Sequence, residues 1–482
     1  MLMKAASQSL TEQLAARFAE RIKNQLLAPG ARLPSVRLCA QQQGVSVSTV
    51  VAAYDQLQAQ GLVVARKNSG FYVRDGVALG AELNRSVGQV IRAREATKNI
   101  VTELTASPRP IDATALLRGM FESGSNRPQP GIGVFPPDWL DTPFLATAVR
   151  KFTTSAALKD TSLSYGDPKG DSALRHALSQ KLGTINVRAA ATQIITTVGA
   201  THALDMVSRT LLKAGDSVMV EEPGWSVEFA RLSALGMRIL PVPRHADGPD
   251  LDVMARYCQL HAPKLFVSVS VFHNPTGYCI SPGSAHRVLQ MANAHDFYVC
   301  EDDTYSHLAP EHATRLCALD GLQRTIYVSG FAKILAPGWR VGFLAAPPVL
   351  VERLESTKLL TTLTTPALLE KALAWCIDQG QLRRHAERIR TRLAEARARS
   401  VKLALSHGCT FAAEPAGLFG WVDTGVDTDA LAQRLLDEGY LIAPGGLFYA
   451  QRAPSPLMRI NFTTTQDAAF WRVFARLRKA AL

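Results

Sequence analysis

Short apolar runs alternate with helical segments from about residue 130 onward, and this alternation is the feature that most constrains the fold. Helical segments separate most of the runs, which is typical of a mostly parallel sheet with helices on its faces. We therefore expect an α/β domain over residues 111–482, with a small C-terminal α+β subdomain at about 375–482. The strand-like runs are 194–198, 218–221, 265–272, 297–301 and 325–329.

A different pattern precedes this domain. Ser9 and Glu12 have the spacing of a capping box, and Pro29-Gly30 ends the helix that they begin. Two further helices, 35–44 and 46–61, and a hairpin of strands 62–65 and 71–73 complete a first domain over residues 1–75. A polar linker, 76–110, follows. The residues expected to face inward are Leu10, Leu14, Phe18, Ile22 and Leu26 in the first helix and Val47, Val50, Val51, Tyr54 and Leu57 in the third.

The positive charge is concentrated near the N-terminus. Residues 1–98 hold 13 Lys or Arg against 6 Asp or Glu, a net charge of +7 out of +12 for the chain. A compact basic segment suits a polyanion such as DNA, although a solvated basic face accounts for the charge equally well.

Other classes of protein are disfavoured by what the sequence lacks. No apolar run is long enough to span a bilayer, and the first residues do not have the pattern of a signal peptide. The seven cysteines are scattered without a CxxC pair, so neither a disulfide framework nor a metal site is indicated. We expect a cytoplasmic protein.

The second and third helices, joined at Gly44, have the spacing of a helix-turn-helix. In that arrangement the start of the third helix enters the major groove, and nearby cations neutralise phosphates. A three-helix core without a nucleic-acid role has a similar pattern, so the motif alone leaves both readings open. The candidate base-reading residues are Ser46, Val47, Ser48 and Thr49, and the candidate phosphate contacts are Arg37, Arg66 and Lys67.

The sequence of this segment resembles the winged helix of the GntR family of bacterial regulators. The resemblance spans about 65 residues and rests on Leu33-Pro34-Ser35-Val36-Arg37, Val45-Ser46, Thr49-Val50 and Gly61-Leu62. It implies binding to a double-stranded DNA operator. Many members of the family carry an arginine at the position of Val47, so the resemblance implies DNA binding but does not indicate the operator sequence.

Three features of the second domain suit a ligand that carries both an aldehyde and an anionic group. Lys333 follows a strand, and a buried, deprotonated lysine forms a Schiff base with an aldehyde. Arg340 lies seven positions further on, and its guanidinium suits a phosphate. The turn at Gly199-Ala200-Thr201 opens a helix whose N–H groups favour an anion. The alternatives are a solvated lysine and an ordinary strand-to-helix turn.

Further candidates follow other strands. Trp225 suits stacking on a planar ring, and Asn274 suits a hydrogen bond to a ring hydroxyl. Asp302 suits a contact with a protonated ring nitrogen, and Tyr305 suits a contact with the ring oxygen. Arg459 is an isolated cation in an apolar strand and needs an anionic partner. The alternatives are a core tryptophan, an Asn-Pro turn, an acidic helix cap and a structural aspartate that pairs with the arginine.

Taken in order, these motifs resemble the fold-type I aminotransferases that use pyridoxal 5′-phosphate (PLP), from about residue 130 to the end. The resemblance implies that Lys333 forms the internal aldimine and that Arg459 binds the α-carboxylate of an amino acid. The other implied cofactor-binding residues are Asp302 on the pyridine nitrogen, Asn274 and Tyr305 on the ring oxygen, Trp225 on the ring face, Ala200, Thr201 and Arg340 on the phosphate, and Tyr165, which matches a tyrosine that reaches the phosphate bound by the partner subunit.

Three positions depart from this family. Gly199, Gly330 and Ala332 stand where serine is frequent, and the serine hydroxyls bind the phosphate or flank the lysine. The departures predict a weaker phosphate site.

A GntR-type winged helix followed by an aminotransferase-like domain resembles the MocR subfamily. That resemblance implies a domain-swapped, head-to-tail homodimer and a regulator that senses an amino acid or amine, or PLP itself, through Lys333. The alternative is an active aminotransferase with an appended winged helix, because both functions need the same residues.

One more helix is rich in arginine. Residues 382–406 carry seven arginines and Lys402 against Glu387 and Glu395. A DNA-guiding surface is one interpretation, and a solvated helix face is the one we favour.

Overall fold

The computed structural model describes residues 9–24, 26–66, 70–74, 112–119 and 129–481. The predicted linker, 76–110, and Lys67 lie outside the described residues. Contacts divide the chain into two units, residues 1–127 with 429–441 and residues 128–428 with 442–482, and each is described by itself.

The first unit begins with three helices, as predicted. Ser9 caps the first helix, and the capping box is complete because the Glu12 carboxylate accepts a hydrogen bond of 2.8 Å from the Ser9 N–H. Gly44, in the left-handed region at φ 66°, ends the second helix, and Ser46 caps the third. The helices are α1 (Leu10–Lys23), α2 (Val36–Gln43) and α3 (Val47–Ala59), and a short helix, α4 (Ala113–Gly119), follows later in the chain.

Tyr54 lies at the centre of the core of these helices. Its ring packs edge-on against Phe18 at 5.6 Å, and its hydroxyl donates to the carbonyl of Pro34 at 3.0 Å. The prediction that Val47 and Val51 face inward was wrong, since they are 51 % and 40 % exposed. The helical period of 3.6 residues places Val50, Ala53, Tyr54 and Leu57 on the buried face and turns the other two valines outward.

A two-stranded antiparallel hairpin follows α3. Strands β1 (Val63–Arg66) and β2 (Gly70–Val73) pair from Val63 with Val73 to Arg66 with Gly70. Arg32 adds a bridge to Tyr72, which ties the hairpin to the segment before α2. Three helices and this hairpin form a winged helix.

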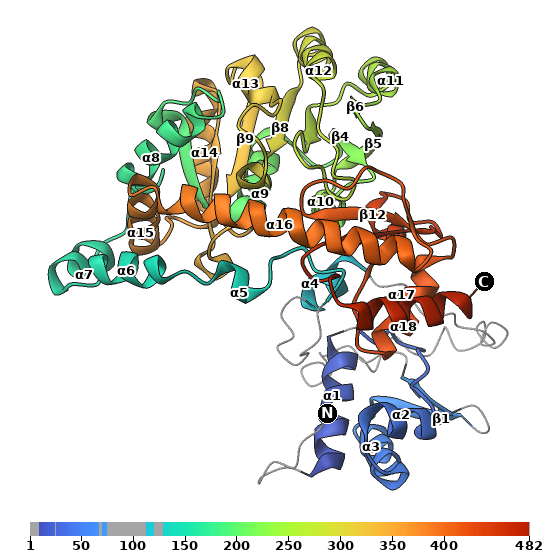
Figure 1. Cartoon of the computed structure of the whole chain (residues 1–482). Coiled ribbons are helices and arrows are strands. Elements are labelled where there is room, and N and C mark those ends of the chain that lie inside the picture. Colours follow the sequence, from blue (N-terminus) through green and yellow to red (C-terminus); the bar gives the residue numbers. More distant parts are fainter. Residues whose placement is uncertain (1–8, 25, 67–69, 75–111, 120–128, 482) are drawn as a thin grey trace, which may run out of the picture. The chain divides into compact units, whose positions relative to one another are not determined.

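The second unit is built on an eight-stranded sheet, as the alternating pattern predicts (Figure 1). Strands β3, β9, β8, β7, β4 and β5 share one direction, while β10 and β6 run antiparallel to their neighbours. In spatial order the strands are β3 (Ile194–Val198), β10 (Val341–Ala345), β9 (Thr325–Gly330), β8 (Tyr298–Asp302), β7 (Leu265–Ser268), β4 (Ser217–Glu222), β5 (Arg238–His245) and β6 (Gly248–Pro249).

One predicted strand is shorter than expected. The run 265–272 ends as a strand at Ser268, because the next N–H, that of Val269, donates to the Glu221 carboxylate at 2.8 Å instead of pairing with a strand. Strands β5 and β10 were not singled out by the sequence pattern. The fold class, α/β with a mostly parallel sheet, is as predicted.

Helices cover both faces of this sheet and enclose two separate cores. Alternate residues of one strand point to opposite faces, so Val218 and Val220 join one core and Met219 joins the other. Helices α9 (Gly199–Leu211), α10 (Ser226–Ala234) and α14 (Pro348–Thr361) contribute to the first core, and α11 (Leu251–His261), α12 (Pro282–His295) and α13 (Leu316–Asp320) contribute to the second.

A second, four-stranded antiparallel sheet lies near the C-terminal end of the chain, in the order β11–β12–β14–β13. Its strands are β11 (Thr410–Phe411), β12 (Phe419–Asp423), β13 (Ala443–Pro444) and β14 (Leu457–Asn461). The remaining helices are α5 (Pro137–Leu140), α6 (Pro143–Phe152), α7 (Ser155–Ser162), α8 (Ser172–Gly183), α15 (Ala367–Asp378), α16 (Gln381–Ser406), α17 (Thr428–Asp437) and α18 (Ala468–Lys479).

Within the described part of the chain, no helix is long and apolar enough to cross a membrane. All seven cysteines are free thiols.

A buried ion pair joins α13 to the sheet. Arg315 Nε lies 2.6 Å from Asp303 Oδ2, and both side chains are inaccessible to solvent. The hydroxyl of Tyr327 also donates to this carboxylate, at 2.9 Å. Removal of one partner leaves the other charge buried and unpaired.

We expect Arg315→Leu to lower the free energy of unfolding by about 3–5 kcal/mol, because Asp303 then lacks its cation in the interior. Denaturant unfolding followed by intrinsic fluorescence measures the change. Arg324→Leu is the control, since it breaks an exposed pair with Asp296 that contributes at most about 1 kcal/mol. Equal effects of the two variants would contradict the prediction.

Candidate functional sites

The start of α3 presents a cluster of hydroxyl groups. Ser46 Oγ lies 2.8 Å from Ser48 Oγ and 2.7 Å from Thr49 Oγ1, so the three groups form one hydrogen-bonded cluster. Val47 beside them is half exposed. The predicted base-reading residues are therefore together at one helix end, as a recognition helix requires.

Exposed arginines flank this helix end. Arg37 is exposed on α2, and the Arg66 guanidinium lies 4.5 Å above the ring of Tyr72 on the hairpin. Arg32, which the sequence reasoning missed, is also exposed and bridges to Tyr72 through its backbone. Its position just before the Leu33-Pro34-Ser35 motif was the available signal. The hairpin thus carries Arg66 over an aromatic ring, and the Arg32 guanidinium lies near Gly70 of the same hairpin.

In the larger unit, the predicted site residues gather at one edge of the sheet. Strands β3, β4, β8 and β9 run in one direction, so their carboxyl ends meet at the same edge. The residues that follow those ends are Thr201, Trp225, Asp302 and Lys333. Ligands of open α/β sheets bind at this edge.

Lys333 lies in the loop after β9. Its Nζ donates a hydrogen bond of 2.6 Å to the carbonyl of Gly133. Burial, together with the nearby Arg459 and Arg340 and against the opposing effect of Asp302, lowers the pKa of Lys333 to about 8. A much larger fraction of the amine than in an exposed lysine is therefore neutral, and hence nucleophilic, near neutral pH.

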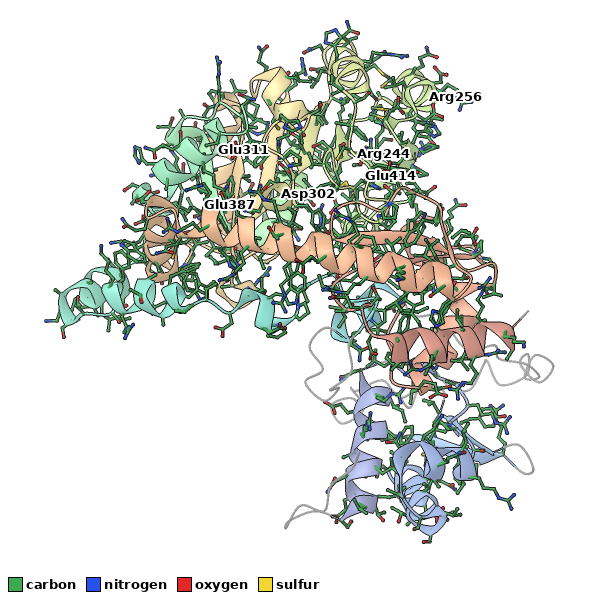
Figure 2. All side chains as sticks on the ribbon, viewed as in Figure 1. Arg244, Arg256, Asp302, Glu311, Glu387 and Glu414 are labelled. Carbon is green, nitrogen blue, oxygen red and sulfur yellow. The ribbon has the colours of Figure 1, made fainter. Side chains whose placement is uncertain are left out.

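Asp302, labelled in Figure 2, ends β8. Burial raises the pKa of Asp302 to about 6, and hydrogen bonds from the N–H and hydroxyl of Thr304 oppose that rise. The carboxylate thus lies in a poorly solvated position, where a cationic partner stabilises its ionised form.

Arg459 on β14 is buried and held from several sides. Its Nη1 donates to Asn274 Oδ1 at 3.0 Å and its Nη2 donates to the carbonyl of Gly131 at 2.5 Å, while its Nε has no partner. Its guanidinium lies 4.4 Å above the ring of Phe419. Burial lowers the pKa of Arg459 to about 10. The partners are neutral, so the guanidinium is available for an anionic ligand.

Tyr305 and Asn274 complete this side of the site. Tyr305 is buried, packs edge-on against Phe419 at 5.6 Å and exchanges a side-chain hydrogen bond with Asn274. Burial raises the pKa of Tyr305, so its hydroxyl stays protonated and can donate. Asn274 joins Tyr305 to Arg459, which places the three predicted residues in one network.

Arg340 lies at the N-terminal end of α9. Its Nη2 donates to the carbonyl of Val198 at 3.3 Å, and α9 begins without a side-chain cap. Gly199 has φ 77°, and a β-carbon added there would lie 2.5 Å from Arg340 Nη2. The guanidinium thus uses the space that a side chain at position 199 would fill, beside the N–H groups of Ala200 and Thr201.

Trp225 caps α10 directly after β4 and is partly buried. Together with Asp302 it lines a cavity of about 20 Å³. Tyr165 is 82 % exposed at the surface, so the prediction that it reaches a partner subunit stays a prediction.

The sequence reasoning missed the segment that lies against these cations. Asn461 Nδ2 donates to the carbonyls of Ile132 and Val134, and it thereby leaves the carbonyls of Gly131 and Gly133 to Arg459 and Lys333. Alternation along an extended segment explains this division, but nothing in the sequence marks backbone carbonyls as partners.

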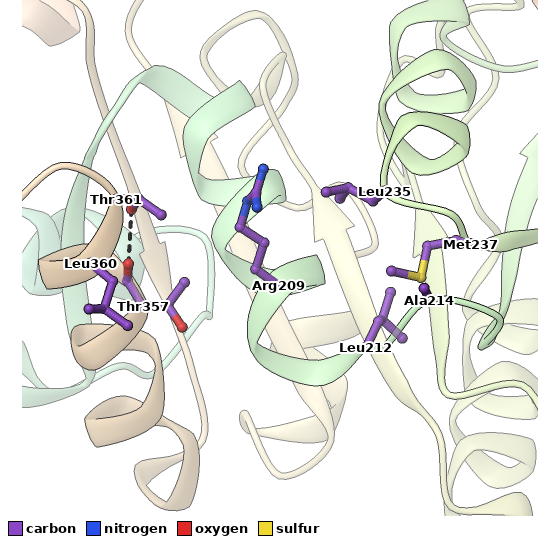
Figure 3. Close-up of a pocket in the computed structure, with 8 residues that line it drawn as sticks. All are labelled: Arg209, Leu212, Ala214, Leu235, Met237, Thr357, Leu360 and Thr361. Carbon is purple, nitrogen blue, oxygen red and sulfur yellow. Dashed lines mark hydrogen bonds between the residues drawn. The ribbon is translucent and has the colours of Figure 1, made fainter.

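An open groove of about 420 Å³ lies elsewhere, between α9 and α14 (Figure 3). Arg209 in this groove pairs with Asp205 at 2.7 Å. None of its eight lining residues is a predicted site residue, so the groove is not part of the site described above. They are Arg209, Leu212, Ala214, Leu235, Met237, Thr357, Leu360 and Thr361.

The arginines of α16 have partners in their own unit. Arg392 pairs with Asp138 at 2.6 Å, Arg397 donates to the carbonyl of Gly417, and Arg399 donates to Gln466. These contacts favour the interpretation of α16 as a surface helix over that of a DNA-guiding surface.

Comparisons with known proteins agree with both halves. Residues 10–73 match the family described as bacterial regulatory proteins, gntR family, and residues 132–475 match the family described as aminotransferase class I and II.

Relatives resemble the chain over most of its length. The uncharacterized HTH-type transcriptional regulator YisV of Bacillus subtilis is 25% identical over 91% of this chain and 90% of its own length. The probable rhizopine catabolism regulatory protein MocR of Rhizobium meliloti is 29% identical over 80% of this chain and 76% of its own. A kynurenine aminotransferase of Pyrococcus horikoshii, solved in complex with PMP, is 26% identical with a TM-score of 0.68 and covers 79% of this chain and 95% of that chain. The chain belongs to the aminotransferase class I and II family and carries a GntR-type DNA-binding domain at its N-terminal end, the domain order of the MocR regulators.

Proposed function

We propose that this chain is a transcription regulator that binds an operator through its winged helix and senses an amino acid or amine with PLP held on Lys333. One observation carries the proposal. A chain with an exposed helix-turn-helix also buries a lysine of lowered pKa and an arginine with neutral partners at the binding edge of an α/β sheet. A DNA-binding domain joined to a small-molecule site is the architecture of a ligand-controlled regulator.

The residues of the site fit PLP. The cradle formed by Gly199, Arg340 and the start of α9 suits a phosphate, and the unpartnered Arg459 Nε suits a carboxylate. Lys333 would hold the aldehyde carbon, Asp302 the ring nitrogen, and Asn274 and Tyr305 the ring oxygen. Bound PLP supplies an electrophilic carbon and an electron-withdrawing ring for an amine.

Arg459 would determine which amines are recognised. A buried guanidinium with neutral partners favours an anionic group, so an α-carboxylate beside the reacting amine adds a charge-assisted hydrogen bond. Amino acids are therefore favoured over simple amines.

The contacts of Gly131 and Gly133 offer a route from ligand to DNA-binding domain. A ligand carboxylate on Arg459 competes with the carbonyl of Gly131, and cofactor attachment removes the amine protons that the carbonyl of Gly133 accepts. These glycines lie between the winged helix and the strands of the larger unit in sequence, so in this proposal a displacement of their segment is the change that links ligand binding to operator binding.

A homodimer accords with the surface of the larger unit. Leu163, Tyr165 and Leu360 are 79 %, 82 % and 90 % exposed. Large apolar side chains with such exposure suit an interface with a second copy, and two copies would read paired half-sites. The head-to-tail, domain-swapped arrangement is part of the same proposal.

Titration of the PLP-loaded protein with amino acids tests the function. We expect a stable change in the visible absorption band together with a change in operator affinity, and Lys333→Ala should lose both the band and the response. Lys402→Ala, which changes an exposed lysine on α16, is the control. Many turnovers with an added keto acid and unchanged operator affinity would favour the aminotransferase instead.

Arg37→Gln and Arg66→Gln test the DNA contacts. Each change should weaken operator binding and reduce the slope of log affinity against log salt by about one, because one phosphate contact is lost. Fluorescence anisotropy at several salt concentrations measures the slope. Arg383→Gln, which removes an exposed charge on α16, should leave it unchanged, and a slope that survives both winged-helix changes would refute this contact map.

Two glycines of the phosphate site provide a matched pair. Gly199→Ser restores the residue frequent in the family, but we expect it to weaken PLP binding about tenfold, because it meets the Arg340 guanidinium and strains a positive φ. In Gly330→Ser the new β-carbon lies 3.4 Å from Ala200 N, an ordinary contact, so binding should be kept or improved. Equilibrium PLP titrations compare them, and tighter binding by Gly199→Ser would contradict the role given to Arg340.

A further inference from the structure

A second carboxylate, Glu228, is buried one helical turn beyond Trp225. Residues three apart on a helix share a face, so Glu228 lies on the same side of α10 as the ring-stacking candidate. Glu228 is 3% exposed. Its two oxygens accept hydrogen bonds from Arg231, at 2.5 Å from Nη2 and 3.2 Å from Nε. The guanidinium holds the carboxylate in place with two charge-assisted hydrogen bonds.

The charge of Glu228 faces the cofactor-side acid Asp302. Both residues line the cavity of about 20 Å³ that Trp225 also lines. Cys300 and Asp302 are two residues apart on β8 and therefore share a face of the sheet, and Glu228 raises the pKa of both groups. The carboxylate of Glu228 thus belongs to the same buried cavity as Asp302.

The other ionisable groups near Asp302 differ from Glu228 in their effect on Asp302. Glu221 lines the same cavity and, like Glu228, pairs with an arginine, but it is not among the main groups that shift the pKa of Asp302. Burial lowers the pKa of His273 well below its usual value, so this ring is neutral. Lys333 favours the ionised form of Asp302, but Lys333 is itself the residue to which PLP would attach.

Arg231 also fixes the position of the pair. Its Nη1 donates to Ser208 Oγ at 3.1 Å and lies 3.6 Å from Asp205 Oδ1, and both partners belong to α9. Because α9 begins at the proposed phosphate cradle, Glu228 is held at a fixed place relative to both ends of the cofactor site.

We propose that Glu228 is a positioning residue that acts through Asp302 and favours a proton on the ring nitrogen of PLP. The inference rests on the proposed function, in which Asp302 faces that nitrogen. Arg231 pairs with Glu228, but of these two groups only the carboxylate is among the main ones that shift the pKa of Asp302, so Glu228 repels the ionised form of Asp302 and a protonated ring nitrogen would offset that repulsion. A cationic ring would therefore stabilise Asp302 and Glu228 together more than it would stabilise Asp302 alone.

The test compares two ligands that differ only at the ring nitrogen. Apoprotein is titrated with PLP and with its carbocyclic analogue, in which a CH group replaces that nitrogen. Glu228→Gln should weaken PLP binding about tenfold, the effect of one pKa unit, and leave the affinity for the analogue within about twofold. Glu228→Asp, which retains the charge, should restore most of the preference for PLP.

Glu387→Gln is the matched control. It removes a glutamate that pairs with Arg383 at 2.9 Å on the exposed face of α16, and it should change neither affinity (Figure 2). Both ligands are measured on the same folded protein, so a loss of stability affects them equally. An equal loss for both ligands in Glu228→Gln, or no loss for either, overturns the inference.

Asp302→Asn separates this inference from the proposed function. If Asp302→Asn keeps the preference of the parent protein for PLP over the analogue, Asp302 does not face the ring nitrogen and the proposed site itself fails. If that variant loses the preference while Glu228→Gln keeps it, the site stands and the role of Glu228 alone is overturned.

Discussion

The common direction of the central strands is the constraint on which the larger unit depends. Side chains from distant parts of the sequence meet because β3, β4, β8 and β9 all end at one edge of the sheet. Residues 201 and 333 are far apart along the chain, yet each needs only a short loop to reach the same site. Strand β10, antiparallel between β3 and β9, returns the chain from Arg340 without disturbing that edge.

Lys333 at this edge and Arg459 on β14 both have neutral partners, and we propose that this charge balance gives the site its chemistry. Lys333 and Arg459 donate to backbone carbonyls, which satisfy hydrogen bonds but carry no full charge. Arg459 lowers the pKa of Lys333, because each of the two positive charges makes the other less favourable. An anionic ligand relieves both costs, whereas a structural aspartate would have stabilised the empty site and reduced the selectivity for ligand.

Sequence reasoning identified charged residues that the structure brings together, but it did not identify their neutral backbone partners. Lys333, Asp302 and Arg459 were identifiable because an ionisable residue at the end of, or inside, an apolar run needs a reason. The carbonyls of Gly131 and Gly133 were not, because backbone groups carry no sequence signal. In the winged helix, the period of α3 separated Val50 from Val51, and the choice of inward residues failed where apolar residues occur on both faces of a helix. Strand β10, residues 341–345, was missed because only a loop with a short 3₁₀ helix, Pro337–Trp339, separates it from β9.

Gly199 and Arg340 show why a departure from a family pattern has to be interpreted together with its neighbours. Alone, the absence of a serine hydroxyl at position 199 predicts a weaker phosphate site. In the structure, the same position has a left-handed backbone and lies against the Arg340 guanidinium. A hydroxyl is a neutral donor, while a guanidinium adds a full positive charge at the helix end that already favours an anion. The glycine therefore permits the closer approach of the cation, and the two positions act as one anion-binding unit.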